Sequence, residues 1–569
     1  MKKKSIVRIF LIIFIVLLQF PLVVFAEKNY VAQIGTEKYE TLTDAIASVT
    51  DTTPTTIKLI NDIINEPVFA VGIEGSTPVK QNITIDLDGY KIVKDNSTGN
   101  GSIFTVIGYG TLTIDDTSNE KKGLITSGNS GRMRGVDVAR GTFILKDGTI
   151  TGSTKDSKWS GAGVNVWSTG TFIMEGGSIE NCYSGKHGGG VHIENYGGVF
   201  TMKGGTIKNN ISTGWGGGVC NGSNFTMEGG TIENNTTSNG GGGITTSGTF
   251  TMTGGIIKEN TANGNTIDDS GGGVCGDGTL TIGGSAVIIN NKWKETTNNF
   301  YLRNNRYIIL DNPKTDMNIG IIMQNSMGKF TTNGLDNNIG LFTPDNSDYA
   351  VRYNKSGYLE LAIGYNIIIT VNDKSMGTAS ANFKKAAAGS QISLTATPKP
   401  GYAFVKWESE DVDNVSDGQF EMPSKIVSVK AVFEKVYKYE FIEGNNTKLT
   451  VGDIKSYILK IDGDYSLFES LKLGNIDLIK DEDYEVTEGS TVITFTDKGI
   501  AKLNTLSKGD HEILVTYTNN KEVKGKVILN SEIENPKTGD NYTTYLITGI
   551  ISLIGVISIS FYTRRKLVK

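Results

Sequence analysis

The feature that most constrains the fold is a phrase repeated through the middle of the chain. The segment "FTMEGGTIENN" at 225–235 recurs with small changes at 172, 200 and 250. A period of 25 to 29 residues, as here, is typical of a solenoid, whereas the blades of a β-propeller need about 40 residues or more. One glycine in each repeat marks this period: Gly148, Gly177, Gly205, Gly230, Gly255 and Gly284.

Each repeat holds three short β-prone pieces, such as "GGVHI", "GVFTM" and "GTIKNN". Glycine or asparagine bounds each piece, and both residue types accept the positive φ of a sharp bend. No stretch within a repeat keeps the 3.6-residue apolar period of a helix over three turns. The sequence therefore predicts a parallel β-helix of triangular coils that stack about 4.8 Å apart.

Stacking aligns equivalent side chains, and burial of each apolar one contributes about 1.5–3 kcal/mol. One inward column is predicted at Val136, Val164, Val191, Val219, Ile244 and Val274, and a second at Ile150, Ile179, Ile207, Ile232 and Ile257. Corner asparagines are expected to pass hydrogen bonds along the axis. The predicted corner positions are Asn181, Asn209, Asn234 and either Glu259 or Asn260.

The segment "YETLTDAIASV" at 39–49 predicts an amphipathic helix. Leu42, Ile46 and Val49 share one face, and Thr41 or Thr43 is available as the N-cap. We interpret this helix as a lid, because the open end of a β-helix is an unpaired edge that invites aggregation. Strand-like segments after residue 291 predict closing coils and a cap down to about residue 364.

The "GGG-[VI]" and "GG-[TS]-I-x-x-N" repeats resemble those of right-handed β-helix surface proteins. These include the polymorphic outer-membrane autotransporters with their GG-[ALI] and FxxN repeats. The resemblance covers about residues 30–360 and implies a right-handed parallel β-helix over 27–364. Such motifs are specific for architecture and weak for activity.

The first 26 residues read as a secretory signal peptide. Lys2, Lys3, Lys4 and Arg8 precede an apolar run, and small residues before Ala26 suit cleavage after that residue. A membrane anchor is the alternative, but the run is short for a full span.

The last segment, 531–569, reads as a cell-wall sorting signal. The sequence Asn535-Pro536-Lys537-Thr538-Gly539 precedes an apolar stretch and a basic end. It resembles the LPxTG-type anchors of Gram-positive surface proteins, with Asn535 in place of the usual leucine. The resemblance implies a sortase that attacks Thr538, a covalent link to peptidoglycan, and a secreted, wall-anchored protein at the cell surface. A permanent single-span membrane protein is the alternative.

Two small β-domains are expected between the β-helix and this signal. Residues 365–435 resemble the divergent internalin B-repeat family through "GYAFVKW", "MPSK" and "KAVFE", with Trp407 as a core anchor or, alternatively, a sugar-stacking platform. Residues 436–530 resemble Ig-like modules, and the alternation in "STVITF" and "HEILVTYT" favours a sandwich.

Charge and cysteine content exclude several classes. Without the signal peptide and the residues after Thr538 the chain has 47 basic and 59 acidic residues. This balance argues against a nucleic-acid partner, which needs a basic surface. Three cysteines in an exported chain of 569 residues exclude a disulfide scaffold. No cofactor and no metal is predicted, since the calcium-like segment at 411–418 lacks two of its ligands.

One outward column is the candidate binding surface. The residue after each buried valine or isoleucine of the first column points outward, which gives Asp137, Asn165, His192, Cys220, Thr245 and Cys275. Arg134 lies near the first of them, and the candidate residues of a basic-plus-carboxylate groove for an acidic sugar are Arg134, Asp137, Asn165 and His192. The column has no paired carboxylates of the glycosidase type, which favours a solvated strand face.

The sequence thus predicts an adhesin-like protein that presents a β-helix to a host or environmental glycan or protein, and not an enzyme. A wall-anchored polysaccharide lyase or glycoside hydrolase is the second hypothesis. A structural surface or biofilm protein is the third.

Overall fold

The computed structural model describes residues 28–72, 80–95, 101–128, 131–155, 158–488 and 490–530. The predicted signal peptide with Ala26 and the predicted sorting signal at 531–569 lie outside these residues. The structure is 49% strand and 6% helix, which confirms the all-β prediction. In the described part of the chain, no helix is both long and apolar enough to cross a membrane.

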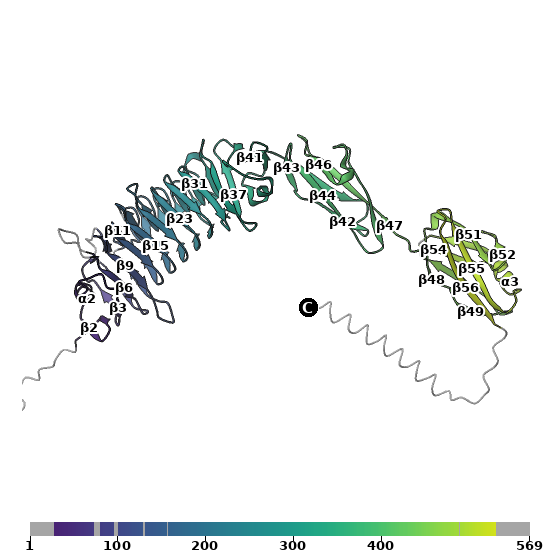
Figure 1. Ribbon diagram of the computed structural model, residues 1–569, viewed down its shortest axis with the longest axis horizontal. Coiled ribbons are helices and arrows are strands. Elements are labelled where there is room, and N and C mark those ends of the chain that lie inside the picture. The colour runs from purple at the N-terminus through teal and green to yellow at the C-terminus, as the bar shows by residue number, and fades with distance from the viewer. Residues whose placement is uncertain are drawn as a thin grey trace, which may run out of the picture. The chain divides into compact units, whose positions relative to one another are not determined.

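Residues up to about 344 form a parallel β-solenoid of about nine coils, which confirms the predicted β-helix (Figure 1). Each coil gives one strand to each of three faces. The first face contains β5 (Phe69–Val71), β8 (Ser102–Val106), β11 (Arg134–Ala139), β14 (Val164–Trp167), β18 (Val191–Ile193), β22 (Val219–Asn221), β26 (Ile244–Thr246), β30 (Val274–Gly276) and β35 (Phe300–Leu302).

The second face contains β3 (Thr55–Leu59), β6 (Asn82–Asp86), β9 (Thr111–Asp115), β12 (Thr142–Leu145), β15 (Thr171–Met174), β19 (Val199–Met202), β23 (Asn224–Met227), β27 (Thr249–Met252), β31 (Thr279–Gly284) and β36 (Ile308–Pro313). The third face contains β4 (Ile63–Ile64), β7 (Lys91–Val93), β10 (Leu124–Thr126), β13 (Thr149–Thr151), β16 (Ser178–Glu180), β20 (Thr206–Lys208), β24 (Thr231–Glu233), β28 (Ile256–Lys258), β32 (Val287–Ile289), β37 (Asn318–Met323) and β39 (Phe342–Pro344).

The later coils contain a fourth strand that the three-piece prediction missed. It is only two residues long and follows the corner after the third face. This short sheet contains β17 (Tyr183–Ser184), β21 (Ile211–Ser212), β25 (Thr236–Thr237), β29 (Thr261–Ala262), β33 (Lys292–Trp293) and β34 (Thr296–Thr297).

Both predicted apolar columns are confirmed. The parallel registers pair Val136 with Val164 and continue through every predicted residue to Val274, and likewise from Ile150 to Ile257. All of these side chains are fully buried. A phenylalanine stack on the second face adds to this core, with ring centroids 4.6–5.3 Å apart along Phe143, Phe172, Phe200, Phe225 and Phe250.

The asparagine ladder exists, but it lies one residue after the predicted Asn209 and Asn234, and the residue after Asn181 is Cys182, which is not an asparagine. The predicted Asn181, Asn209 and Asn234 have φ of 54–56°, as does Glu259, and this left-handed bend points the next side chain inward. The ladder residues are therefore Asn210, Asn235, Asn260 and Asn291, all fully buried, so Asn260 is the correct member of the predicted pair. Each Nδ2 donates to the Oδ1 of the next at 2.9–3.0 Å.

The predicted helical lid is confirmed as α2 (Leu42–Ser48). The Thr41 side chain caps it by accepting a hydrogen bond from the Asp44 backbone N–H, and Leu42 and Ile46 are buried. The Gln81 amide ties the lid to the coils, because Nε2 donates to the carbonyls of Ile46 and Val49. Before the helix, β1 (Ala32–Ile34) and β2 (Glu37–Tyr39) pair antiparallel.

After the last coil the pairing becomes antiparallel. The strands are β38 (Gly328–Lys329), β40 (Tyr349–Asn354) and β41 (Tyr358–Val371), and a 3₁₀ helix spans Asp336–Leu341. The next strands are β42 (Gly377–Ala381), β43 (Lys385–Ala387), β44 (Gln391–Pro398), β45 (Tyr402–Glu408), β46 (Gln419–Glu421) and β47 (Val427–Lys435). Trp407 is only 7% exposed, which confirms it as a core residue and contradicts the alternative of a sugar platform.

The C-terminal residues form two sheets around their own apolar core. One sheet contains β48 (Phe441–Glu443), β50 (Ile458–Ile461), β54 (Thr491–Phe495) and β53 (Tyr484–Thr487). The other contains β49 (Thr447–Thr450), β56 (Glu522–Asn530), β55 (Gly509–Tyr517), β51 (Phe468–Leu473) and β52 (Ile476–Leu478). The helix α3 (Asp497–Leu503) was not predicted.

Candidate functional site

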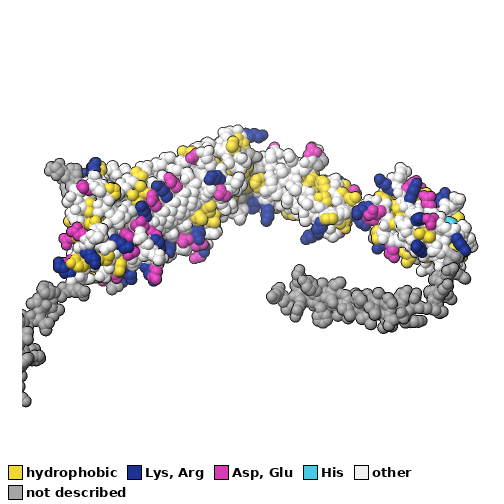
Figure 2. Space-filling view, turned by 60° about the horizontal axis from the view of Figure 1, so that its bottom comes forward, with side chains coloured by type: hydrophobic (Ala, Val, Ile, Leu, Met, Phe, Trp, Pro, Cys, Tyr) yellow, Lys and Arg dark blue, Asp and Glu magenta, His cyan; other side chains and the backbone are white. Residues whose placement is uncertain are grey.

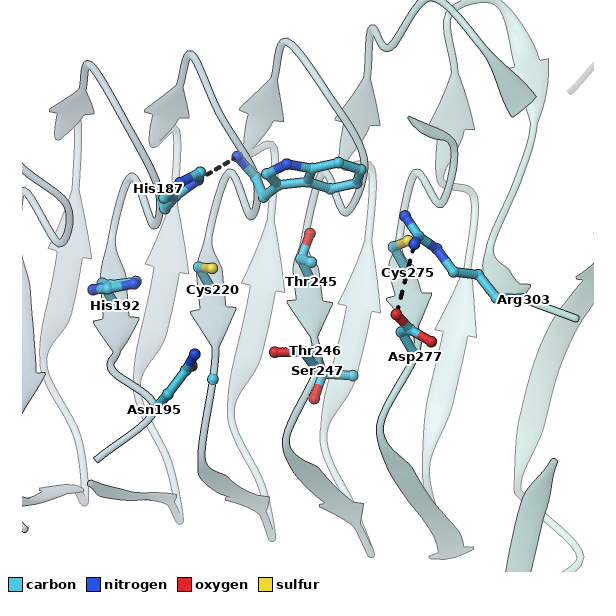
Figure 3. Close-up of a pocket in the computed structure, with 12 residues that line it drawn as sticks. His187, His192, Asn195, Cys220, Thr245, Thr246, Ser247, Cys275, Asp277 and Arg303 are labelled. Atoms are coloured by element: carbon cyan, nitrogen blue, oxygen red, sulfur yellow. Dashed lines mark hydrogen bonds and ion pairs between the residues drawn. The ribbon is translucent and has the colours of Figure 1, made fainter. Parts of the chain in front are cut away.

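The outward column predicted from the sequence lies in register on the first face. Neighbouring strands pair Asp137 with Asn165, Asn165 with His192, and so on through Cys220 and Thr245 to Cys275. Figure 3 shows the later members as one row on successive strands. Parallel pairing thus places Cys220 and Cys275, which are 55 positions apart in sequence, only two coils apart.

The later members of this row form the floor of a groove of about 320 Å³: His192, Cys220, Thr245 and Cys275. The corner before the first face forms one wall, and the turn after the first face forms the other. The lining residues are His187, His192, Asn195, Trp215, Cys220, Gly222, Thr245, Thr246, Ser247, Cys275, Asp277 and Arg303.

The expectation of an exposed column is therefore wrong for two of its members. Asn165 and Cys275 are each 1% exposed, because the corner loops rise above the strands on which they lie. Of the four residues predicted to bind ligand, only His192 lines the groove; Arg134, Asp137 and Asn165 do not.

His192 is the titratable residue at one end of the floor. Its Nδ1 lies 3.0 Å from Asn165 Oδ1. An amide oxygen only accepts hydrogen bonds, so Nδ1 carries the proton and Nε2 keeps its lone pair. Burial, and then the nearby His187 and Arg134, lower the pKa of His192 to about 4. The ring is therefore neutral at pH 7 and can accept a hydrogen bond.

The two thiols in the groove are poor nucleophiles. Burial raises the pKa of Cys220 to about 12 and that of Cys275 to about 11. The thiolate is the reactive form of cysteine, and it is scarce at neutral pH when the pKa is this high. His192 and Cys220 occupy equivalent positions in the register of the neighbouring strands β18 and β22. All three cysteines of the protein are free.

An aromatic and charged cluster forms the other end of the groove. The Arg303 guanidinium lies 5.4 Å from the Trp215 ring centroid and 3.6 Å from the Asp277 carboxylate. Arg306 also pairs with Asp277, at 2.9 Å. The Trp215 indole extends over the next coil, where a Cβ on Gly240 would lie 2.8 Å from Cζ3. The missing side chain at Gly240 thus leaves room for the indole.

Sequence reasoning missed Trp215, His187 and Arg303. A signal existed for the first two, because each lies four residues before a buried valine of the first column. The backbone confirms the equivalence, since the Gly188 N–H donates to the Trp215 carbonyl. The backbone N–H of Trp215 in turn donates to His187 Nδ1 at 3.2 Å, which is the dashed line at His187 in Figure 3. Arg303 lies beyond the glycine period, so no repeat position indicated it.

The predicted pair of Arg134 and Asp137 neutralises itself. Arg134 Nη1 lies 2.7 and 2.8 Å from the two Asp137 carboxylate oxygens, and the guanidinium lies 5.2 Å from the Trp159 ring centroid. This arrangement fixes both charges in place and leaves neither as a free acid or base. Among the described residues, no group of three His, Cys, Asp or Glu side chains could hold a metal ion.

Comparison with known families identifies one module. Residues 367–437 match the divergent InlB B-repeat domain. This match confirms the resemblance stated for residues 365–435 and covers about an eighth of the chain. No curated protein matches the chain.

Solved structures give only weak similarity. SGBP-B of the Bacteroides ovatus mixed-linkage glucan utilization locus, in complex with a mixed-linkage heptasaccharide, is 15% identical with a TM-score of 0.13. The alignment covers 33% of this chain and 37% of that chain. BcpA, the major pilin subunit of Bacillus cereus, is 15% identical over 29% of this chain and 69% of that chain, with a TM-score of 0.13. Scores this low carry no argument about fold or function.

Proposed function

We propose that the protein is a surface-displayed binding protein whose solenoid groove holds a glycan. The observation that carries this proposal is the groove itself, in which an indole, one amide, hydroxyls and a neutral imidazole converge on one concave strip of the first face. Glycan sites combine an aromatic platform for the sugar ring with a few fixed polar groups for its hydroxyls. Trp215 would be the platform, and Asn195, Thr245 and His192 would be the polar partners.

The groove chemistry favours binding over catalysis. Hydrolysis of a glycosidic bond needs two carboxyl groups on either side of it, whereas Asp277 is the carboxylate among the lining residues and is held by two arginines. A lyase needs a base near the sugar, and His192 has a pKa of about 4, which makes it a weak one. We therefore place the lyase or hydrolase second and a structural surface protein third.

The sequence supports display at the cell wall. The signal peptide ending at Ala26 would export the chain, and a sortase would join Thr538 to peptidoglycan. The InlB-type module and the C-terminal β-sandwich, which lie between the solenoid and this anchor in the sequence, would act as a stalk. Mass spectrometry of muramidase-released wall material would test the anchor through a C-terminal peptide that ends at Thr538.

Glycan binding can be tested with residues 28–530 on a glycan array, followed by calorimetry on each hit. Trp215→Ala should weaken binding about tenfold or more, which corresponds to about 1.4 kcal/mol. Thr226→Ala, on the outward side of the second face, is the matched control and should bind as wild type does. Equal affinities of the two variants would exclude the groove as the binding site. Self-association in sedimentation without any glycan hit would favour the structural hypothesis.

A further inference from the structure

Exposed aromatic side chains lie along the turn that joins the first face to the second. Trp167 is 40% exposed, Tyr196 is 71% exposed, and Tyr109 on an earlier coil is 61% exposed. Single exposed aromatic residues are normal on a protein surface, but several on one edge mark an interaction site. We call Trp167 and Tyr196, which lie on neighbouring coils, the aromatic edge.

The aromatic edge continues the rim of the groove. Trp167 lies two residues after Asn165 on β14, so both point to the outward side of the first face. Asn195 lines the groove and Tyr196 follows it directly. The Thr169 N–H donates to the Tyr196 carbonyl at 3.1 Å, which places the turns that carry Trp167 and Tyr196 on neighbouring coils.

The combined surface is long and follows the solenoid axis. From β14, which carries Trp167, to β35, which precedes Arg303, the first face advances by five coil steps. Each step is about 4.8 Å, so the surface is about 24 Å long. A chain of pyranose rings linked through opposite sides advances by a similar distance for each ring. A linear oligosaccharide of about five rings therefore matches this length, whereas one sugar would occupy a single step.

The charges along this surface argue against an anionic ligand. Arg303 and Arg306 share Asp277, Arg134 is paired with Asp137, and Arg140 at the same edge takes part in an interaction of its own. The Glu194 N–H donates to the Val166 carbonyl, so this acidic residue lies beside Trp167 and would repel an anion. On the face of the solenoid turned to the viewer in Figure 2, where no histidine is visible, basic and acidic side chains are interspersed without a broad basic area.

We propose that the aromatic edge and the groove form one elongated site for an uncharged linear polysaccharide that runs along the solenoid axis. The apolar ring faces of the sugars pack on Trp167 and Tyr196 at the start of this surface and on Trp215 near its middle, where the indole extends over the coil of Gly240. Their hydroxyls hydrogen-bond to Asn195, to Nε2 of His192 and to Thr245. This inference rests on the proposed glycan-binding function and adds the ligand's charge, its length and a second set of contacts.

Affinity electrophoresis of residues 28–530 tests the charge of the ligand. The neutral probes are hydroxyethyl cellulose, a mannan and dextran, and the charged probes are polygalacturonate and alginate. Retardation by at least one neutral polymer and by neither charged polymer is the expected result. Stronger retardation by a charged polymer overturns the inference, and no retardation by any of the five overturns it together with the proposed function.

Calorimetry with a trisaccharide and a hexasaccharide of the retarding polymer tests the length. The double variant Trp167→Ala/Tyr196→Ala should lose about tenfold in affinity for the hexasaccharide and stay within about twofold for the trisaccharide. Trp215→Ala should weaken binding of both. Tyr465→Ala, an exposed tyrosine of the C-terminal β-sandwich, is the control and should change neither. Circular dichroism melts of each variant report whether the fold is intact.

The outcomes separate the two proposals. Wild-type affinity of the edge double variant for the hexasaccharide overturns the elongated site, while loss of binding in Trp215→Ala still supports the groove. Wild-type affinity in both the edge variant and Trp215→Ala overturns the proposed function as well.

Discussion

Replacing Asn235 with alanine should destabilise the solenoid strongly, because this side chain joins two coils to its own. Its Oδ1 accepts hydrogen bonds from the backbone N–H and the Nδ2 of Asn210, at 3.0 and 2.9 Å. Its Nδ2 donates to the Ile207 carbonyl and to Asn260 Oδ1, both at 2.9 Å. The variant removes all four bonds from a site that is fully buried.

The expected loss follows from the net value of a buried hydrogen bond, which is about 1 kcal/mol. Four such bonds amount to about 4 kcal/mol. The backbone N–H of Asn210 is then left buried without its acceptor, and an unsatisfied buried donor costs about 1–3 kcal/mol by itself. Together these contributions should lower the free energy of unfolding by about 5–7 kcal/mol.

Urea denaturation of residues 28–530, with hydrogen exchange measured by mass spectrometry, tests this prediction. Asn234→Gly is the matched control, because Asn234 is exposed and has a φ of 54°, which glycine adopts without strain. The control should change stability by no more than about 0.5 kcal/mol. Faster exchange should appear in peptides around residue 210 of Asn235→Ala alone. Equal stability of the two variants, or unchanged protection near Asn210, would refute the role assigned to the ladder.

Three further predictions concern the ladder and the groove. After Asn291 the ladder continues to Asn299, whose Oδ1 accepts from Asn291 Nδ2 at 3.1 Å. Asp345 ends it by accepting from the Asn299 N–H and Nδ2 at 2.5 and 2.6 Å, and burial raises the pKa of Asp345 to about 6. The protonated form is thus favoured by folding, so the solenoid should lose stability as pH rises from about 4 through 6, and Asp345→Asn should remove that slope in melts across this range. Cys182→Asn should extend the ladder, since an amide there reaches Asn210 Oδ1 and the Ile150 carbonyl, and should raise the urea-derived stability by about 1 kcal/mol. His192 should stay neutral down to about pH 5 in an NMR titration, because its pKa is lowered to about 4; a midpoint near 6.5 would contradict the burial assigned to the groove floor.

The asparagine positions show where sequence reasoning was limited. The repeats place two polar residues side by side at each corner, such as Asn209 and Asn210. Both suit a corner, and only the backbone angle of the first decides which side chain enters the core. That angle depends on how the short fourth strand continues the coil, and two residues are too few to show a strand in the sequence.

The candidate site was predicted in part for a similar reason. The column from Asp137 to Cys275 was predicted in register, because one residue aligned per coil determines the rest. Its burial was not predicted, since it depends on corner loops whose lengths differ from coil to coil. Trp215 becomes part of a wall only because Gly240 on the next coil leaves space for the indole.

The amino-acid sequence by itself determined the stacked architecture, the two apolar columns and the helical lid, while the structure chose Thr41 over Thr43 as its cap. These features depend on local propensity and on a repeat period, both of which are written in consecutive residues. The tertiary structure alone decided which asparagines form the ladder, that the outward row is a groove floor, and that Arg303 meets Trp215. Those outcomes depend on contacts between coils, because a side chain on one coil, or the space that a glycine leaves there, determines which side chain of the neighbouring coil fits against it.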